Sequence, residues 1–249
     1  MAEDPRNNAM QTWLSREIGT VKMRQASGDL TDPDNWWTAY AQDYAGRTWK
    51  SYRDLLSEYI RHAEGGPLLD VGCGYGFLVE CARQFGIVAV GLEAAENALE
   101  RGRALHPLAD IRSWKGGEPL PIESESMAGA MLNEFVDHIT IEQNRLLFRE
   151  LGRVLKPGGT LMVKSPSRYN SFDQDAGHVT FFSPSEFKVF VQGFSFEVIE
   201  QPFVPQPFLG TSRAGRLAMR GLTTLFKPEA WNARNDLVAR KAPRVRLDR

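Results

Sequence analysis

Residues 68–78, with the sequence LLDVGCGYGFL, place three glycines within five positions directly after a short apolar run. The apolar run predicts a strand, and the apolar stripe after the glycines predicts a helix. Glycines allow a tight turn between the two elements and leave backbone N–H groups accessible to a ligand. The segment therefore predicts an open α/β sheet with a ligand-binding loop at the end of its first strand.

The chain after residue 66 alternates short apolar runs with longer helical patterns, an order typical of strands joined by crossover helices. The predicted fold class is α/β, a Rossmann-like doubly wound sheet of seven strands, mostly parallel with an antiparallel last strand. Strands are predicted at residues 68–71, 87–92, 111–113, 128–133, 160–164, 196–200 and 236–242. The clearest helix covers residues 141–155, and the sequence KPGG ends it before the next strand.

Four regions are predicted: a helical cap at 1–62, a catalytic core at 63–201, an insertion with a Pro-rich loop and a helix at 202–234, and a last strand and tail at 235–249. Aromatic residues at nearly helical spacing predict the cap, and they either pack on the core or cover a ligand. The insertion helix, residues 213–226, carries arginines on one side and apolar residues on another. It is either a docked helix with a solvated face or a surface that recognises an anionic or lipid-linked acceptor.

The composition excludes several classes of partner. A formal net charge of −1 does not favour nucleic acid or an anionic membrane. Cys73 and Cys81 are too few for a disulfide framework and lack the spacing of a zinc site. The first ten residues do not resemble a secretory signal, and no apolar run reaches the ~20 residues of a membrane span. These features predict a cytoplasmic protein without an integral membrane segment.

The spacing of the glycines narrows the choice of ligand. Dinucleotide-binding loops have the pattern G-x-G-x-x-G, whereas this loop reads G-x-G-x-G and has Phe77 in place of the third glycine. A Walker loop is excluded because no G-K-S or G-K-T follows. A turn that served only packing would not need the two acids, Asp70 in the first predicted strand and Glu93 directly after the second. Loop and acids together indicate one ligand-binding crevice.

The sequence DVGCGYG resembles motif I, (E/D)-x-G-x-G-x-G, of the class I S-adenosylmethionine-dependent methyltransferases, and in particular their small-molecule, type 11-like members. Two further segments extend the resemblance over roughly residues 40–200. LFRELGRVLKPGGTLMV is similar to the family's helix, turn and fifth strand, and GHVTFFSPSEFKVF is similar to a late histidine loop. The resemblance implies S-adenosyl-L-methionine as the cofactor and methyl transfer as the activity.

The resemblance also implies which residues contact the cofactor. Glu93 takes the position of an acid that binds both ribose hydroxyls, and Asn133 takes the position of motif IV. Many relatives have Gly-Asp-Ala where this chain has KGG at residues 115–117, so backbone groups there are expected to bind the adenine, with Trp114 stacking on it. The expected cofactor-binding residues are Asp70, Gly72, Cys73, Gly74, Gly76, Glu93, Ala94, Lys115, Gly116, Asn133, Glu134 and Tyr44.

Two histidines, His178 and His138, are the candidate catalytic residues. Methyl transfer is an in-line displacement, and a hydroxyl acceptor gains from a general base, a role that suits histidine at neutral pH. Support of a loop accounts for His178 equally well, and packing at a helix start or a ribose contact accounts for His138. Only Asn133, Glu134 and Asp137 follow the fourth strand as oxygen ligands, so the sequence predicts no metal.

The predicted function is transfer of a methyl group from S-adenosylmethionine to a small-molecule acceptor, at an oxygen. An N- or C-methyltransferase, a catalytically silent cofactor-binding regulator or scaffold, and a nucleotide-binding oxidoreductase stay open as alternatives. Nucleic acid is not expected as the acceptor, because no basic and aromatic track crosses the core and the tetrapeptide N-P-P-[YF] is missing. The sequence does not determine the acceptor or the oligomeric state, and a homo-oligomer stays open.

Overall fold

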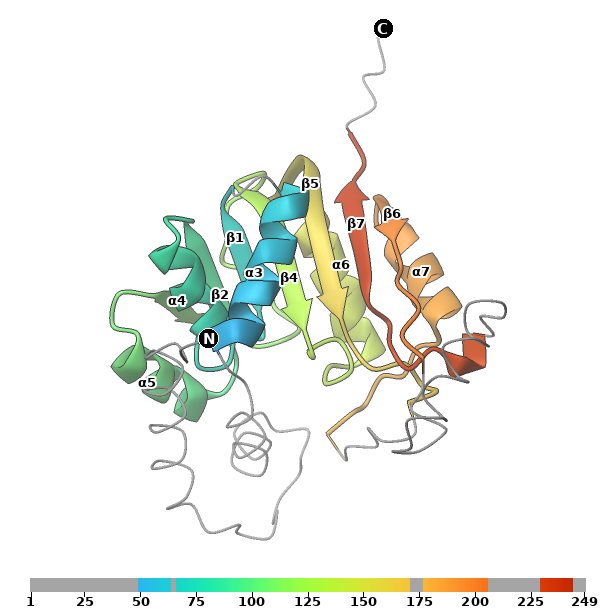
Figure 1. Cartoon of the computed structure of the whole chain (residues 1–249), viewed down its shortest axis with the longest axis horizontal. Helices are drawn as coiled ribbons and strands as arrows, with labels where there is room; N and C mark the ends of the chain where they lie inside the picture. The colour runs from blue at the N-terminus through green and yellow to red at the C-terminus, as the bar shows by residue number, and fades with distance from the viewer. Residues whose placement is uncertain (1–48, 64–65, 171–176, 206–228, 244–249) are drawn as a thin grey trace, which may run out of the picture.

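The computed structural model describes residues 49–63, 66–170, 177–205 and 229–243. Within these residues, strands form one sheet in the order β3-β2-β1-β4-β5-β7-β6 (Figure 1). The strands are β1 (Leu68–Val71), β2 (Ala89–Glu93), β3 (Asp110–Ser113), β4 (Met127–Asn133), β5 (Leu155–Lys164), β6 (Phe196–Glu200) and β7 (Leu237–Lys241). Strands β1 to β5 are parallel, and β7 is antiparallel to its neighbours β5 and β6. The predicted fold class is confirmed.

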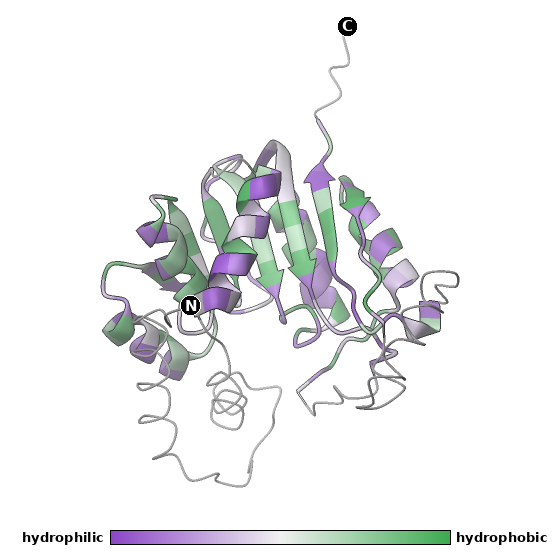
Figure 2. Ribbon diagram, viewed as in Figure 1, coloured by the Kyte–Doolittle hydropathy of each residue, from purple (hydrophilic) through white to green (hydrophobic). Residues whose placement is uncertain are grey.

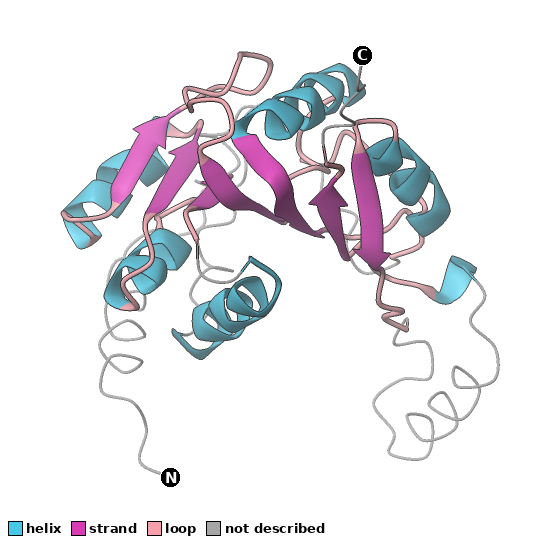
Figure 3. Cartoon of the chain, turned by 90° about the horizontal axis from the view of Figure 1, so that it is seen from above, coloured by secondary structure: helices cyan, strands magenta, loops and turns pink. Residues whose placement is uncertain are grey.

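Helices cover both faces of the sheet (Figure 3). They are α3 (Trp49–Ala63), α4 (Phe77–Gln84), α5 (Glu96–Leu105), α6 (Ile141–Val154) and α7 (Pro184–Gln192), with a short 3₁₀ helix, η2 (Glu229–Trp231). Leu69 and Val71 of β1 share a core cluster with α6 and α7, whereas Leu68 shares one with α3 and α4. Alternate residues of β1 therefore face the two helical layers, as the two-residue period of a strand requires.

The strand order places a switch point at β1. The chain runs from β1 to β2 and β3 on one side, and then returns to add β4 on the other side of β1. Loops at the carboxyl ends of β1 and β4 thus leave in opposite directions and open the crevice where sheets of this kind bind ligands. The strands are apolar along most of their length and the outer helix surfaces are hydrophilic (Figure 2), which is typical of a sheet buried on both faces.

The boundaries of five strands differ from the prediction, and those of β5 and β2 differ most. β5 begins at Leu155 instead of residue 160, so the KPGG sequence lies inside the strand. Gly158 has a φ of 75°, and the pairing register shifts between Met127 and Gly129 of β4, so the turn is accommodated as an irregularity of the β4–β5 ladder. β2 begins at Ala89 instead of residue 87.

Helix α3 is attached to the core by several specific contacts. Tyr52 is buried and stacks on Phe77 at a centroid distance of 5.3 Å. The hydroxyl of Tyr59 donates a hydrogen bond of 2.7 Å to the carbonyl of Gly66, and burial raises the pKa of this hydroxyl. Thr160 of β5 donates to the carbonyl of His62 at 2.9 Å. No helix in the described part of the chain combines the length and apolar character needed to cross a membrane.

Candidate active site

The loop between β1 and α4 holds its glycines in the left-handed backbone region, which favours glycine. The φ angles of Gly72, Gly74 and Gly76 are 75°, 55° and 74°. Space is a second constraint, because a Cβ on Gly72 would lie 2.3 Å from Cδ2 of Phe135. A Cβ on Gly76 would lie 2.8 Å from Cγ2 of Ile111. The loop therefore passes between its neighbours only because it lacks side chains at these positions.

Glu93, at the end of β2, binds the glycine loop directly. Its Oε2 accepts a hydrogen bond of 2.9 Å from the N–H of Gly74. Its Oε1 accepts hydrogen bonds from the N–H groups of Ala94 and Ala95 at 2.8 and 3.0 Å. The carboxylate is buried and joins the tip of the loop to the start of α5. The structure thus brings two of the predicted cofactor-binding segments into contact at the carboxyl edge of the sheet.

Cys73 belongs to the loop, but its side chain faces the interior. It packs in a cluster with Ile111 and against β2, where a Cβ on Gly91 would lie 2.7 Å from its Sγ. Burial, reinforced by the negative charges of Asp70 and Glu93, raises the pKa of the Cys73 thiol well above its usual value. The thiol is therefore protonated, and only the backbone of Cys73 is left for the predicted contact with a ligand.

The loop predicted to bind adenine contacts the start of α6. The carbonyl of Gly116 accepts a hydrogen bond of 3.1 Å from Nε2 of Gln143, while Lys115 is exposed. Gln143 also completes a capping box with Thr140 at the N-terminus of α6. Trp114 is buried in the core and meets Phe135 in a tilted contact with a centroid distance of 6.4 Å. Stacking of Trp114 on adenine stays a prediction.

An ion-pair network connects the end of β4 to the start of β7. Glu134 follows Asn133 with a φ of 53° and pairs with Nη2 of Arg234. Nε of Arg234 donates a second bond of 3.0 Å to Oδ1 of Asp236. Burial disfavours the charge of Arg234, but the carboxylates of Glu134 and Asp236 outweigh it and raise the pKa of the guanidinium. Arg234 therefore holds two acids together at the carboxyl edge.

Asp137 links the loops that follow β4 and β5. Its Oδ2 lies 2.8 Å from Nε2 of His178, and its Oδ1 accepts a bond of 3.0 Å from the hydroxyl of Ser165. His138 lies beside them, with its Nε2 3.6 Å from Oδ2 of Asp137 and its ring 4.6 Å from that of His178. The side chains of Asp137 and His178 are 4% exposed, against 18% for His138. The two candidate catalytic histidines therefore share one buried carboxylate.

Burial has a smaller effect on the pKa of Asp137 than attraction to the nearby histidines has in total. Burial by itself would raise the pKa of the carboxyl group, but the hydrogen bond from His178 and the nearby charge of His138 hold the pKa below its usual value. The backbone carbonyl of Asp137 also accepts the N–H groups of Val179 and Thr180 at 2.8 and 3.1 Å. Asp137 is thus an ionised anchor for the segment that begins at His178.

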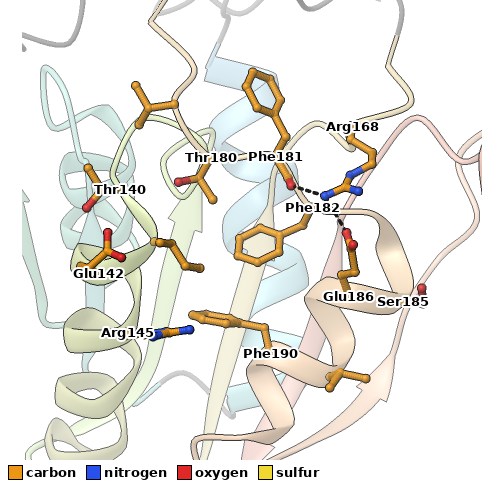
Figure 4. A pocket seen from close by; sticks show the side chains of 13 residues that line it. Thr140, Glu142, Arg145, Arg168, Thr180, Phe181, Phe182, Ser185, Glu186 and Phe190 are labelled. Atoms are coloured by element: carbon orange, nitrogen blue, oxygen red, sulfur yellow. Dashed lines mark hydrogen bonds and ion pairs between the residues drawn. The ribbon is translucent and has the colours of Figure 1, made fainter.

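A groove of about 810 Å³ lies on the outer side of that segment, between α6 and α7 (Figure 4). Its apolar lining includes Phe181, Phe182 and Phe190, and the Arg168–Glu186 ion pair of 2.8 Å borders it. None of the predicted cofactor-binding residues lines it. The groove is therefore separate from the crevice at β1, although Thr180 in its wall is attached to Asp137.

A family model described as a methyltransferase domain matches residues 69–163, the stretch from β1 to β5. A trans-aconitate 2-methyltransferase of Sinorhizobium medicae is 27% identical over 180 residues, which cover 69% of this chain and 64% of that protein. A mitochondrial ubiquinone biosynthesis O-methyltransferase of Mus musculus is 26% identical over 167 residues, 60% of this chain and 45% of that protein. The chain spans less than two thirds of the length of each of these relatives.

The same class appears among solved structures. A SAM dependent methyltransferase from Archaeoglobus fulgidus superposes with a TM-score of 0.59 at 17% sequence identity. The match covers 83% of this chain and 100% of that structure. That likeness shows the fold, and the family match covers the glycine loop, Glu93 and the end of β4. The chain therefore contains a class I S-adenosylmethionine-dependent methyltransferase domain. S-adenosyl-L-methionine is the cofactor of this class of domain.

The predicted site residues fall into three groups along the carboxyl edge. The ends of β1 and β2 carry Asp70, the glycine loop, Glu93 and Ala94. The end of β4 carries Asn133 and Glu134, and the loop after β3 carries Lys115 and Gly116. Tyr44 and the helix predicted at 213–226 lie outside the described residues, and the binding roles stay predictions. Sequence reasoning missed Phe135 and Arg234, since no local pattern reveals a ring beside a distant glycine or an ion pair 100 residues apart.

Proposed function

We propose that the chain transfers the methyl group of S-adenosylmethionine to an oxygen atom of a small-molecule acceptor. The observation that supports this most is the contact of Glu93 with the glycine loop at the switch point. It sets a carboxylate, which accepts hydroxyl protons, beside the glycine loop, and this arrangement suits an adenosine. The activities that two relatives are named for, ubiquinone O-methylation and trans-aconitate methylation, favour a small acceptor that carries oxygen.

Within this proposal the two halves of the edge have different tasks. The donor is held by the residues predicted for it: Asp70, the glycine loop, Glu93, Ala94, Lys115, Gly116, Asn133 and Glu134. The loops after β4 and β5 hold the acceptor in line with the methyl group. The cap at 1–62 and the insertion at 202–234 frame the acceptor. His138 is the better placed of the two histidines to take a proton, because it is more exposed than His178.

The direct test is a binding and turnover experiment on the purified chain. We expect saturable binding of S-adenosylmethionine by calorimetry, and S-adenosylhomocysteine formation when phenols, hydroxy acids or carboxylates are supplied, but not when amines are. Binding without turnover on any acceptor or cell extract would instead identify a catalytically silent regulator. Absence of binding would contradict the proposal altogether, and preferential binding of NAD would favour an oxidoreductase.

The role of the histidines is tested separately. His138→Ala and His178→Ala are each assayed for turnover after their affinity for the donor has been measured. A general base contributes about 10²- to 10⁴-fold to such a reaction. Unchanged turnover in both variants would remove the histidines from the mechanism without affecting the donor site. A cytoplasmic location is part of the proposal and agrees with Cys73 and Cys81 being buried free thiols.

A further inference from the structure

Three side chains that the sequence separates converge at the ends of β4 and β5. Asp137, His138 and His178 each offer one ligand atom, and these atoms all lie within 4.8 Å of one another. His178 comes from the segment after β5, whereas the other two follow β4. The oxygen-rich set expected for a magnesium site is absent from this cluster, but a carboxylate with two imidazoles is a different type of ligand set.

Two distances within the cluster are close to those of a metal site. Tetrahedral ligand atoms about 2 Å from zinc lie roughly 3.3 Å from one another. Here Oδ2 of Asp137 lies 2.8 Å from Nε2 of His178 and 3.6 Å from Nε2 of His138. Both imidazoles thus present Nε2 to the same carboxylate oxygen, and movement of the side chains would place an ion among the three ligand atoms, which all lie within 4.8 Å of one another.

Neighbouring groups orient two of the three side chains, His138 and Asp137. Nδ1 of His138 lies 3.3 Å from the carbonyl of Gly177, so a proton on Nδ1 leaves Nε2 as the coordinating atom. The hydroxyl of Ser165 donates to Oδ1 of Asp137, which leaves Oδ2 facing the histidines. Metal-binding histidines and carboxylates characteristically have such outer partners.

We propose that Asp137, His138 and His178 bind one divalent first-row transition-metal ion, of which Zn²⁺ is the representative. Imidazole with one carboxylate suits such ions, and three protein ligands leave at least one coordination position open. On the proposed function, that position takes the acceptor oxygen, and the bound ion lowers the pKa of the acceptor hydroxyl, so that its proton passes to water in place of a histidine base. Metal binding itself does not depend on that function.

A simpler role for the cluster is a hydrogen bond between His178 and Asp137 that fixes the loop. The two roles make opposite predictions for metal binding. The chain has four histidines, and the other two, His62 and His106, lie outside the cluster. His62 and His106 therefore provide a matched control with the same number of imidazoles removed.

The experiment uses the full chain after treatment with EDTA and dialysis. Co²⁺ is added without donor or acceptor, and its visible absorption and calorimetric binding are measured, followed by competition with Zn²⁺. We expect one ion per chain and a tetrahedral Co²⁺ spectrum. Asp137→Asn and the double variant His138→Gln/His178→Gln should weaken binding at least about 100-fold, since loss of outer partners alone costs 10- to 100-fold. The double variant His62→Gln/His106→Gln should bind like the wild type.

Each result either supports or overturns the proposal. Absence of saturable Co²⁺ and Zn²⁺ binding to the folded wild-type chain would overturn it without any variant. Binding that Asp137→Asn and the cluster variant leave unchanged would also overturn it, with circular dichroism showing that each variant is folded. Donor affinity measured with and without EDTA keeps this outcome distinct from failure of the proposed methyl transfer.

Discussion

The two halves of the sheet's carboxyl edge are built by different means. At β1 and β2, main-chain groups form the site, with three left-handed glycines and a single carboxylate, Glu93, that accepts the N–H groups of Gly74 and Ala94. At β4, β5 and β7, side chains form it, through the pairs of Asp137 with His178 and of Arg234 with Glu134. The first half depends on the absence of side chains, and the second depends on a balance of charge.

This difference determines what each half tolerates. A bare loop between packed neighbours cannot admit even a methyl group, because an added Cβ collides with Phe135 or Ile111. A charge network can accept a change of shape, but it cannot lose one partner without leaving a buried charge uncompensated. Substitutions should therefore damage the first half by volume and the second half by charge.

The largest effect is expected for Gly72→Ala. The new Cβ would lie 2.3 Å from Phe135 at a φ of 75°, so both strain and collision apply. We expect a loss of about 3 kcal/mol of unfolding free energy and at least ~100-fold weaker donor binding. Gly86→Ala is the control, because Gly86 also has a φ of 75° but no atoms within 4 Å of an added Cβ.

That control should cost only about 1 kcal/mol and leave donor affinity unchanged. Urea denaturation and calorimetry with S-adenosylmethionine measure both quantities. Equal effects of the two substitutions would show that strain alone, and not the contact with Phe135, limits the loop.

A second large effect is expected for Arg234→Met, which removes the cation between Glu134 and Asp236. Breaking a largely buried pair in this way should lower the unfolding free energy by about 3 kcal/mol. Arg168→Met, which breaks an exposed ion pair with Glu186, should cost less than about 1 kcal/mol. Similar losses for the two variants, measured by thermal denaturation, would contradict a special role for charge balance in this half.

A smaller effect is expected for Glu93→Gln. Both carboxylate oxygens accept backbone N–H groups, and an amide can satisfy only one side. Donor binding should weaken by about 10- to 100-fold, the range for a hydrogen bond to a charged group. Glu96→Gln, at an exposed residue of the adjoining helix, is the matched control and should leave calorimetric affinity nearly unchanged. An unaffected Glu93→Gln variant would remove this carboxylate from the donor site.

The smallest effect concerns His106, which belongs to neither half of the edge and packs edge-on against Phe77 at a centroid distance of 4.8 Å. Burial lowers the pKa of His106 in the folded chain below its usual value. His106 therefore binds a proton more readily in the unfolded chain than in the folded chain. Its contribution to the unfolding free energy is complete above about pH 6.5 and declines as the pH falls below that value. His106→Gln should flatten this decline in urea titrations between about pH 7 and pH 5. An unchanged slope would assign the decline to other groups.

The sequence predicted the half that is built locally. The segment from Leu68 to Gly76 contains its strand, its turn and its glycines in one stretch, and β1 is found at the predicted residues. Glu93 is predictable because an acid directly after a buried parallel strand lies at the carboxyl edge, where sheets of this kind bind ligands. The alternation of strands and helices also predicted the sheet, since each element carries its own period.

The other half escaped prediction because its contacts join distant residues. Asp137 meets Ser165 and His178, and Glu134 meets Arg234, through the strand order and not through spacing. The sequence by itself determined the fold class and the glycine loop, because backbone conformation and hydrophobic period are local properties. Only the tertiary structure decided how the charges at the ends of β4 and β5 and at β7 are paired, because electrostatic interactions depend on distance in space and on burial.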